Sequence, residues 1–174
     1  MKLNENQLKE IDEKGYLILP DCFSNEEVNN LRKAMTTVFN EKTEANIVEK
    51  SSGVVRTAMG LHLRSKIFDD LTRHPKFFEP ACQIRGRNLY IQQTKINVKA
   101  AFTGEVWQWH YDFATHSGED GVPKPLALNL HVFLDDVTEF NGPLFFIPKS
   151  HKYGSAPSKL DTVTTNYPLW VVDQ

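Results

Sequence analysis

Hydrophobic residues recur at helical spacing in the N-terminal part of the chain. Residues 3–14 carry apolar side chains a few positions apart among Glu and Lys, and the stretch stops at Gly15, which predicts a short amphipathic helix with a glycine cap. Further on, Ser24 and Glu27 form a capping box, and the apolar residues behind them recur in steps of three and four. A second helix is therefore predicted over residues 25–40.

Shorter elements are predicted between these helices and residue 87. Residues 16–19 are a continuous apolar run, typical of a buried strand, whereas residues 41–53 show no period and indicate a surface loop. Residues 67–71 and 76–84 return to a helical pattern. The interruption near Pro75 is expected because the residue before a proline disfavours helical backbone.

From residue 88 the pattern changes to a period of two. Residues 88–98 alternate over a long stretch and carry polar groups on both faces, and three more strand candidates follow at 106–113, 126–134 and 144–147. Helices first and short strands afterwards predict an α+β domain, with helices covering one side of an antiparallel sheet or sandwich.

Length and composition favour one domain over residues 1–174. The chain is 40% hydrophobic and 24% charged and has no low-complexity tract. We divide it into a helical part of about 1–87, a β part of about 88–150 and a polar tail of about 151–174.

Charge and hydropathy argue against several kinds of partner. A formal net charge of −2 and a pI near 6.3 provide no electrostatic footprint for nucleic acid or for an anionic membrane. No apolar stretch approaches the roughly 20 residues that span a bilayer, and the first residues lack the apolar region expected of a secretory signal. Cys22 and Cys82 belong to no zinc pattern and are predicted to be free thiols. We expect a cytoplasmic protein, a monomer or homodimer, that acts on a small molecule.

The strongest candidate for chemistry is the segment from Trp107 to Phe113. On a strand, His110 and Asp112 would leave the same face with backbones about 6.6 Å apart, so both could reach one cation. An imidazole and a carboxylate are two thirds of the facial triad that holds Fe(II) and leaves positions open. Trp107 would help to form a water-poor wall and contact the substrate. A His-x-Asp pair also occurs by chance. Gln108, however, would lie on the same strand face as His110 and Asp112, and three polar side chains in one row favour a common binding partner.

Several stretches with matching order and spacing, from about Gly15 to Ser150, resemble the phytanoyl-CoA dioxygenase family of iron(II)/2-oxoglutarate oxygenases, and most closely its ectoine hydroxylase branch. These stretches are Tyr90–Asn97, Trp109–Phe113, Glu119–Pro123, Glu139–Leu144 and Ile147–His151. The resemblance implies a double-stranded β-helix, the jelly-roll core of cupin-like proteins, with N-terminal helices packed on one sheet.

The resemblance also implies roles for individual residues. His110 and Asp112 would bind iron, while Gln93, Lys95 and Asn97 would contact 2-oxoglutarate, because the matching strand lines the cosubstrate pocket. Amide and ammonium groups can donate to a keto acid, which fits that role. The alternative is that these three polar residues lie on a solvated sheet face.

Two further residues are candidates for substrate binding. Arg56 matches a segment near the substrate mouth and could hold a carboxylate with two hydrogen bonds, or it could form a surface ion pair. The ectoine branch carries an aromatic residue at the position of His116, so His116 either contacts a different polar substrate or faces solvent in a loop.

The family also uses a distal histidine as third iron ligand and an arginine about ten residues later. Neither is found after residue 152, and His151 matches a turn, so we expect the chain to be C-terminally incomplete. The implied function is an iron(II)- and 2-oxoglutarate-dependent dioxygenase that uses O2 to hydroxylate an unactivated C–H bond of an amino acid or related zwitterion. The alternatives are a truncated non-catalytic binding domain and a cupin-like metal enzyme that does not use 2-oxoglutarate.

Overall fold

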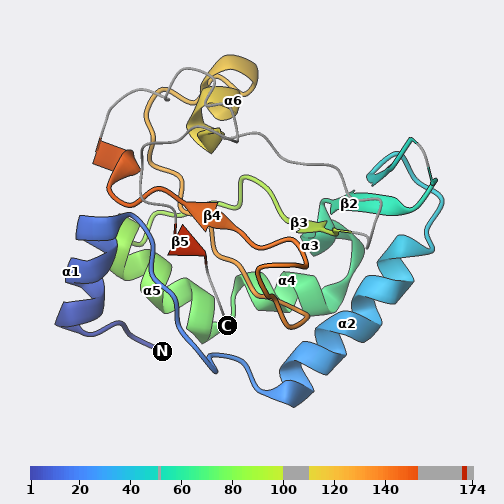
Figure 1. Ribbon diagram of the computed structural model, residues 1–174, viewed down its shortest axis with the longest axis horizontal. Coiled ribbons are helices and arrows are strands. Elements are labelled where there is room, and N and C mark those ends of the chain that lie inside the picture. The colour runs from blue at the N-terminus through green and yellow to red at the C-terminus, as the bar shows by residue number, and fades with distance from the viewer. Residues whose placement is uncertain (51, 100–109, 153–169, 172–174) are drawn as a thin grey trace.

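The computed structural model describes residues 1–50, 52–99, 110–152 and 170–171, and Figure 1 shows helices around a small sheet. The helices are α1 (Glu5–Lys14), α2 (Asn25–Phe39), α3 (Leu61–Arg64), α4 (Lys66–Thr72), α5 (Pro75–Arg85), α6 (Asp112–Glu119) and the 3-10 turn η1 (Ser150–Lys152). The strands are β1 (Asn46–Val48), β2 (Val55–Met59), β3 (Lys95–Asn97), β4 (Phe145–Phe146) and β5 (Trp170–Val171). The described part therefore mixes helices and strands, as expected, and is more helical than β.

Local capping explains where the first two helices begin and end. Asn4 pairs with Gln7 in a capping box at the start of α1, and Gly15 ends that helix with φ of 90°. Ser24 and Glu27 form the predicted capping box at the start of α2. Both helices are confirmed, because each begins at a capping box in its own first turn and α1 also ends at a glycine.

Helices α4 and α5 are also confirmed, together with the break between them. Pro75 occupies the first turn of α5, where its missing N–H costs no hydrogen bond, and the His74 side chain accepts from the Lys76 backbone N–H. Gly86 follows the helix with φ of 84°. A proline at a helix start and a glycine at its end make these boundaries readable from sequence.

The strand predictions were less accurate. Residues 16–19 and 126–134 form no strand, and the long strand predicted over 88–98 is reduced to β3. The loop predicted over 41–53 contains β1, which pairs with β2. The strand predicted at 144–147 is confirmed only as the two residues of β4, which pair with β5.

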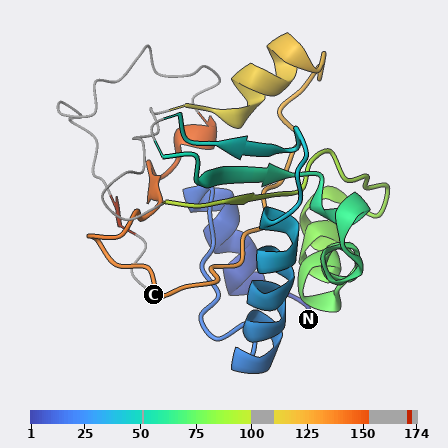
Figure 2. The same ribbon diagram turned by 90° about the vertical axis from the view of Figure 1, so that its right-hand side faces the viewer.

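Strands β1, β2 and β3 form one antiparallel sheet in that order. Figure 2 shows these strands side by side, with α2 packed beneath them and α6 beyond the sheet on the other side. The hydrophobic core lies between the sheet and the helices and consists of Leu31, Val38, Ala58, Leu61 and Phe68. Burying a large apolar side chain contributes about 1.5–3 kcal/mol, so this cluster holds one face of the sheet on the helices.

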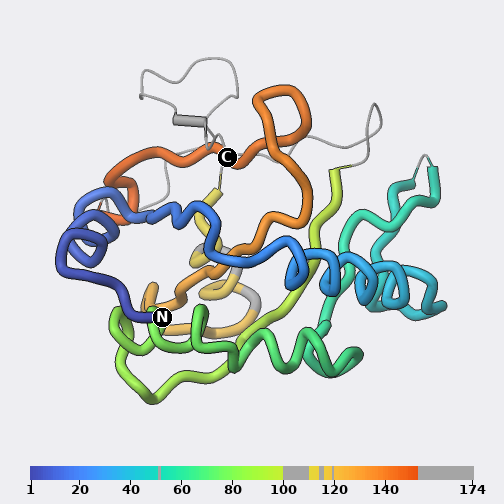
Figure 3. The backbone as a smooth tube through the Cα atoms, turned by 90° about the horizontal axis from the view of Figure 1, so that it is seen from below, coloured from blue at the N-terminus to red at the C-terminus, as the bar shows by residue number. Residues whose placement is uncertain are grey.

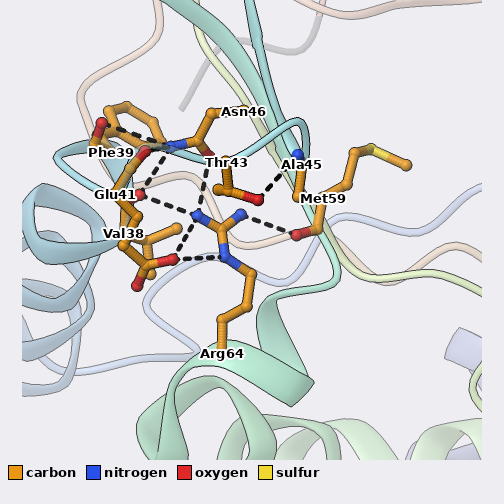
Figure 4. A network of polar contacts seen from close by, with 8 residues as sticks. All are labelled: Val38, Phe39, Glu41, Thr43, Ala45, Asn46, Met59 and Arg64. Carbon is orange, nitrogen blue, oxygen red and sulfur yellow. Dashed lines mark hydrogen bonds and ion pairs between the residues drawn. The ribbon is translucent and has the colours of Figure 1, made fainter.

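Arg64 joins three elements in a polar network that Figure 4 shows from close by. Its guanidinium donates to the carbonyls of Val38 and Met59 and to the Asn46 side chain, at 2.9, 3.0 and 2.9 Å. It also pairs with Glu41 at 2.8 Å. Asn46 donates in turn to the Val38 and Glu41 carbonyls. The end of α2, the start of β1 and the end of β2 are thereby fixed to α3.

None of the described helices is long and apolar enough to cross a membrane.

Candidate metal centre

His110 and Asp112 lie together, although the local backbone differs from the prediction. Asp112 is the first residue of α6 and Tyr111 is its extended N-cap residue, so the strand predicted over 106–113 is wrong at its end, and residues 106–109 lie outside the described part. His110 Nε2 and Asp112 Oδ1 are nevertheless 3.2 Å apart. The helix start turns the Asp112 side chain toward the imidazole that precedes it.

Both side chains remain accessible. The His110 side chain is 54% exposed and the Asp112 side chain is 40% exposed. Asn129 donates from its side-chain amide to Asp112 Oδ2, which leaves Oδ1 as the oxygen that faces His110. An oriented carboxylate beside an imidazole is a donor set that suits a divalent transition metal.

His131 lies in the same neighbourhood. The residue as a whole is exposed, but neighbouring atoms partly desolvate its ring and lower its pKa; Asp112 acts to raise that pKa and Lys95 acts to lower it further. Asn129 and His131 were given no role from the sequence. The signal was present: they are polar residues two apart in the apolar stretch 126–134, so they share a face in extended backbone.

The three residues predicted to bind 2-oxoglutarate lie at or just before β3. Gln93, Lys95 and Asn97 are all exposed, and Lys95 is close enough to His131 to affect its pKa. The Asn97 side-chain oxygen accepts from the Thr57 hydroxyl at 3.0 Å, across the β2–β3 pair. Cosubstrate binding by these residues stays a prediction.

Arg56 lies in β2, where its carbonyl accepts from the Val98 N–H at 2.8 Å. Burial lowers the pKa of Lys99, and the positive charge of Arg56 lowers it further, whereas the buried Glu49 raises it. Glu49 and Arg56 lie on the β1–β2 hairpin, and Lys99 follows β3 close enough for both charges to affect its pKa. The substrate role of Arg56 stays a prediction.

His116 lies inside α6, four residues after Asp112. Its side chain is only 15% exposed, and Nδ1 is 2.9 Å from Asp120 Oδ2, which also accepts from Gln92 at 3.2 Å. The hydrogen bond with His116 is the main reason that the pKa of Asp120 is lowered. The expectation of a solvent-facing loop residue is thus wrong, and contact with a substrate stays a prediction.

Trp107, which was predicted to contact the substrate, lies outside the described residues. Within the described part of the chain, no group of three or more His, Cys, Asp and Glu side chains could hold a metal ion. The described centre therefore offers the pair His110 and Asp112.

The family model for phytanoyl-CoA dioxygenase matches residues 11–171. The chain belongs to this family. The resemblance read from the sequence motifs is confirmed, and the match covers the helical part, the sheet and the candidate centre together.

Relatives in the phytanoyl-CoA dioxygenase family include hydroxylating enzymes from bacteria. An L-proline trans-4-hydroxylase from Streptomyces griseoviridis is 39% identical over 140 residues, which are 80% of this chain and 52% of that protein. An ectoine dioxygenase from Bordetella parapertussis is 36% identical over 154 residues, which are 86% of this chain and 50% of that protein. The chain spans about half the length of these curated relatives.

Solved structures of a related protein also match about half of their length to this chain. The crystal structure of EctD from S. alaskensis with 2-oxoglutarate and 5-hydroxyectoine matches with a TM-score of 0.81 and 33% identity, over 86% of this chain and 54% of that one. The structure of the same protein with bound Fe matches equally well. These structures of EctD hold iron in one case and 2-oxoglutarate in the other, and this chain shares the backbone arrangement of about half of that protein.

Proposed function

We propose that this chain is part of an iron(II)- and 2-oxoglutarate-dependent dioxygenase that hydroxylates a C–H bond of an amino acid or related zwitterion. The observation that carries the proposal is the 3.2 Å approach of His110 Nε2 to Asp112 Oδ1, in a chain of a family whose relatives are hydroxylases. The proposed whole fold is the jelly-roll, of which the described sheets are a part.

The residues present fit an iron(II) ion. One imidazole nitrogen and one carboxylate oxygen face each other, and the other carboxylate oxygen accepts from Asn129. Nitrogen and oxygen donors of this kind suit Fe(II), and the exposure of both side chains leaves space for further ligands. When bound, iron with 2-oxoglutarate and O2 supplies the oxidant that removes hydrogen from the substrate carbon.

The chain's own residues would bind and orient the reactants. His110 and Asp112 would hold the metal, and Asn129 would keep the Asp112 carboxylate turned toward it. Lys95, with Gln93 and Asn97 on the exposed edge at β3, offers a positive charge and two amides to the carboxylates of 2-oxoglutarate. A positive charge there favours a dianionic cosubstrate over a neutral one.

The proposed substrate class rests on the relatives and on two side chains. Proline and ectoine, the compounds in the relatives' names, are small zwitterions, which supports a similar substrate here. Arg56 would pair with the substrate carboxylate, and His116 would present the ring edge not used by Asp120. Because the chain spans about half of its relatives, the activity and substrate of the whole protein belong to this proposal.

The test is turnover with matched variants. The chain is incubated with Fe(II), ascorbate, 2-oxoglutarate and either L-proline or ectoine, and succinate and hydroxylated product are measured together. Because the family's third iron ligand is not found after residue 152, we expect slow formation of product with at least one substrate and its loss in His110→Ala and Asp112→Ala. Asp70→Ala, which removes an exposed carboxylate that pairs with Lys66 on α4, should leave turnover unchanged.

The outcomes also separate the alternatives. Product formed without any need for 2-oxoglutarate would favour a different cupin-like metal enzyme. Calorimetric binding of 2-oxoglutarate with no succinate from the wild-type chain would favour a binding domain. Either result would contradict the hydroxylase proposal for this chain.

A further inference from the structure

Tyr111 stands between the two candidate metal ligands and points elsewhere. Its backbone is extended, with φ of −101° and ψ of 131°, so its side chain leaves the chain on the side away from its neighbours His110 and Asp112. Its hydroxyl donates to the carbonyl of Ser150 at 2.7 Å, in a partly buried position 39 residues further along. The residue thus ties the metal-binding segment to η1.

The acceptor of this hydrogen bond belongs to a well-fixed turn. The Ser150 N–H donates to the Ile147 carbonyl at 3.2 Å, and the Lys152 N–H donates to the Lys149 carbonyl at 2.9 Å. Ile147 is buried with 9% exposure. Lys149 adopts a positive φ of 68°, which is uncommon for a residue with a side chain and persists only where its surroundings hold it.

Helix α1 provides those surroundings. The Lys149 N–H donates to the Lys14 carbonyl at 2.8 Å, and His151 Nε2 donates to the Asp12 carbonyl at 2.8 Å. Lys152 also pairs with the Asp12 carboxylate at 3.2 Å. Figure 3 shows the dark blue N-terminal helix beside the orange-red segment that ends in η1. The Ser150 carbonyl is therefore anchored to the N-terminal helix.

We infer that Tyr111 is a positioning residue for the metal centre: its hydroxyl, held by the Ser150 carbonyl of a turn docked on α1, sets the orientation of the backbone that carries His110 and Asp112. This inference rests on the proposed function, because it assumes that His110 and Asp112 bind the same divalent ion. Tyr111 acts through the backbone and contacts neither metal nor substrate in this account.

The structure holds the ligand segment from two sides. Asn129 fixes the Asp112 carboxylate directly, and Tyr111 fixes the peptide immediately before it. Removing the hydroxyl leaves the ring in place but frees the peptide to rotate at the start of α6. A ligand pair that is no longer pre-oriented must be ordered by the metal itself, which lowers affinity.

The test is Co(II) binding by Tyr111→Phe, followed through calorimetric affinity and the visible absorption spectrum of the bound ion. We expect affinity to fall by about tenfold, at the lower end of the effect of losing a group that orients a metal ligand, and we expect the spectrum at saturation to change. The matched control is Tyr16→Phe, which deletes the same hydroxyl from a ring stacked on Phe146 at 5.1 Å. Tyr16→Phe should keep both the affinity and the spectrum of the wild type.

The possible results distinguish a failure of the positioning role of Tyr111 from a failure of the metal site. If His110→Ala abolishes Co(II) binding but Tyr111→Phe matches Tyr16→Phe in affinity and spectrum, the positioning role is refuted and the metal site stands. A lower thermal midpoint of Tyr111→Phe with unchanged Co(II) affinity and an unchanged spectrum would also refute it, since a purely structural role moves only stability. If the wild-type chain binds no Co(II), or His110→Ala binds it equally well, the proposed function fails and this inference fails with it.

Discussion

The two oxygens of the Asp112 carboxylate have different neighbours. Oδ2 accepts from Asn129 and Oδ1 lies 3.2 Å from His110 Nε2. A carboxylate fixed in this way presents one oxygen in a defined direction without the help of a metal. Pre-orientation of this kind reduces the entropy lost when a ligand side chain binds an ion.

The residues of this centre were only partly readable from sequence. The His-x-Asp spacing singled out the correct pair, but the expected strand geometry was wrong at Asp112, which begins a helix. The pair still converges because a helix start can also turn a side chain toward the residue before it. Asn129 stood out only as a polar residue in an apolar stretch, and its role was missed because its contact with Asp112 joins residues 17 positions apart.

Glu27 gives a residue-scale prediction about pH. Hydrogen bonds from Lys76 and from the Ser24 backbone lower its pKa from 4.5 to about 2. Because the folded pKa is depressed, the stability that Glu27 contributes is fully present above pH 4.5 and is lost as pH falls toward 2. Urea unfolding midpoints between about pH 5 and pH 2.5 should therefore fall less steeply in Glu27→Gln than in the wild type.

Lys76→Gln provides the matched test of the cause. It removes the largest contribution to the lowered pKa of Glu27 while the helix cap at Ser24 stays in place. We expect a pH dependence between those of the wild type and Glu27→Gln. Identical slopes for all three proteins would contradict this assignment.

At the scale of elements, Arg64 fixes the β1–β2 hairpin to the helices. Its side chain is 13% exposed, and its loss would leave the Met59 carbonyl and the Glu41 carboxylate without this partner. An unsatisfied buried polar group costs about 1–3 kcal/mol, so we expect Arg64→Ala to lower the free energy of unfolding by about 2–3 kcal/mol. Chemical denaturation measures this value.

Arg73 is the control for Arg64. It pairs with Asp69 on the surface, and its side chain is 68% exposed. Exposed ion pairs contribute about 0–1 kcal/mol, so Arg73→Ala should have a much smaller effect. Equal losses in the two variants would mean that the Arg64 network does not hold the hairpin.

Gly15 joins helix α1 to the turn that anchors Tyr111. It has φ of 90°, and a Cβ there would lie 2.3 Å from His151 Nδ1. Gly15→Ala should therefore cost more than the roughly 1–3 kcal/mol of backbone strain, because the His151 ring must also move. Gly60→Ala is the control, since Gly60 has φ of 66° and a methyl group added there would meet no other atom within 4 Å.

The measurement for Gly15 is the thermal midpoint together with hydrogen exchange of the amides at 149–152. Gly15→Ala should lower the midpoint further than Gly60→Ala and speed exchange in the turn. If only the midpoint falls, and to the same extent in both variants, the contact between Gly15 and His151 does not hold the turn.

Elements differ in how far their sequence defines them. Helices α1, α2 and α5 were predicted correctly because capping residues and apolar steps lie within each segment. The strands were poorly predicted because each depends on partners remote in sequence. β3 pairs with β2 about 38 positions away, from Ala58 to Ile96, and its length is set by that pairing rather than by its own alternation.

At the scale of the whole molecule, the N-terminal helix closes on the segment that follows β4. Contacts from Asp12 and Lys14 reach Lys149, His151 and Lys152 across nearly 140 positions. The family resemblance could be predicted from motifs, but this closure could not, because neither segment carries a sign of the other in its sequence. In our proposal, these contacts connect α1 to the metal centre through η1 and Tyr111.

A double-mutant cycle shows whether His110 and Asp112 bind one divalent ion together. Co(II) affinity is measured by calorimetry for the wild type, His110→Ala, Asp112→Ala and the double variant. If both side chains hold the same ion, either substitution removes most of the affinity and the second adds little, so the two effects are strongly non-additive. Independent, additive effects, or wild-type affinity in either single variant, would mean that the two side chains do not hold a common ion.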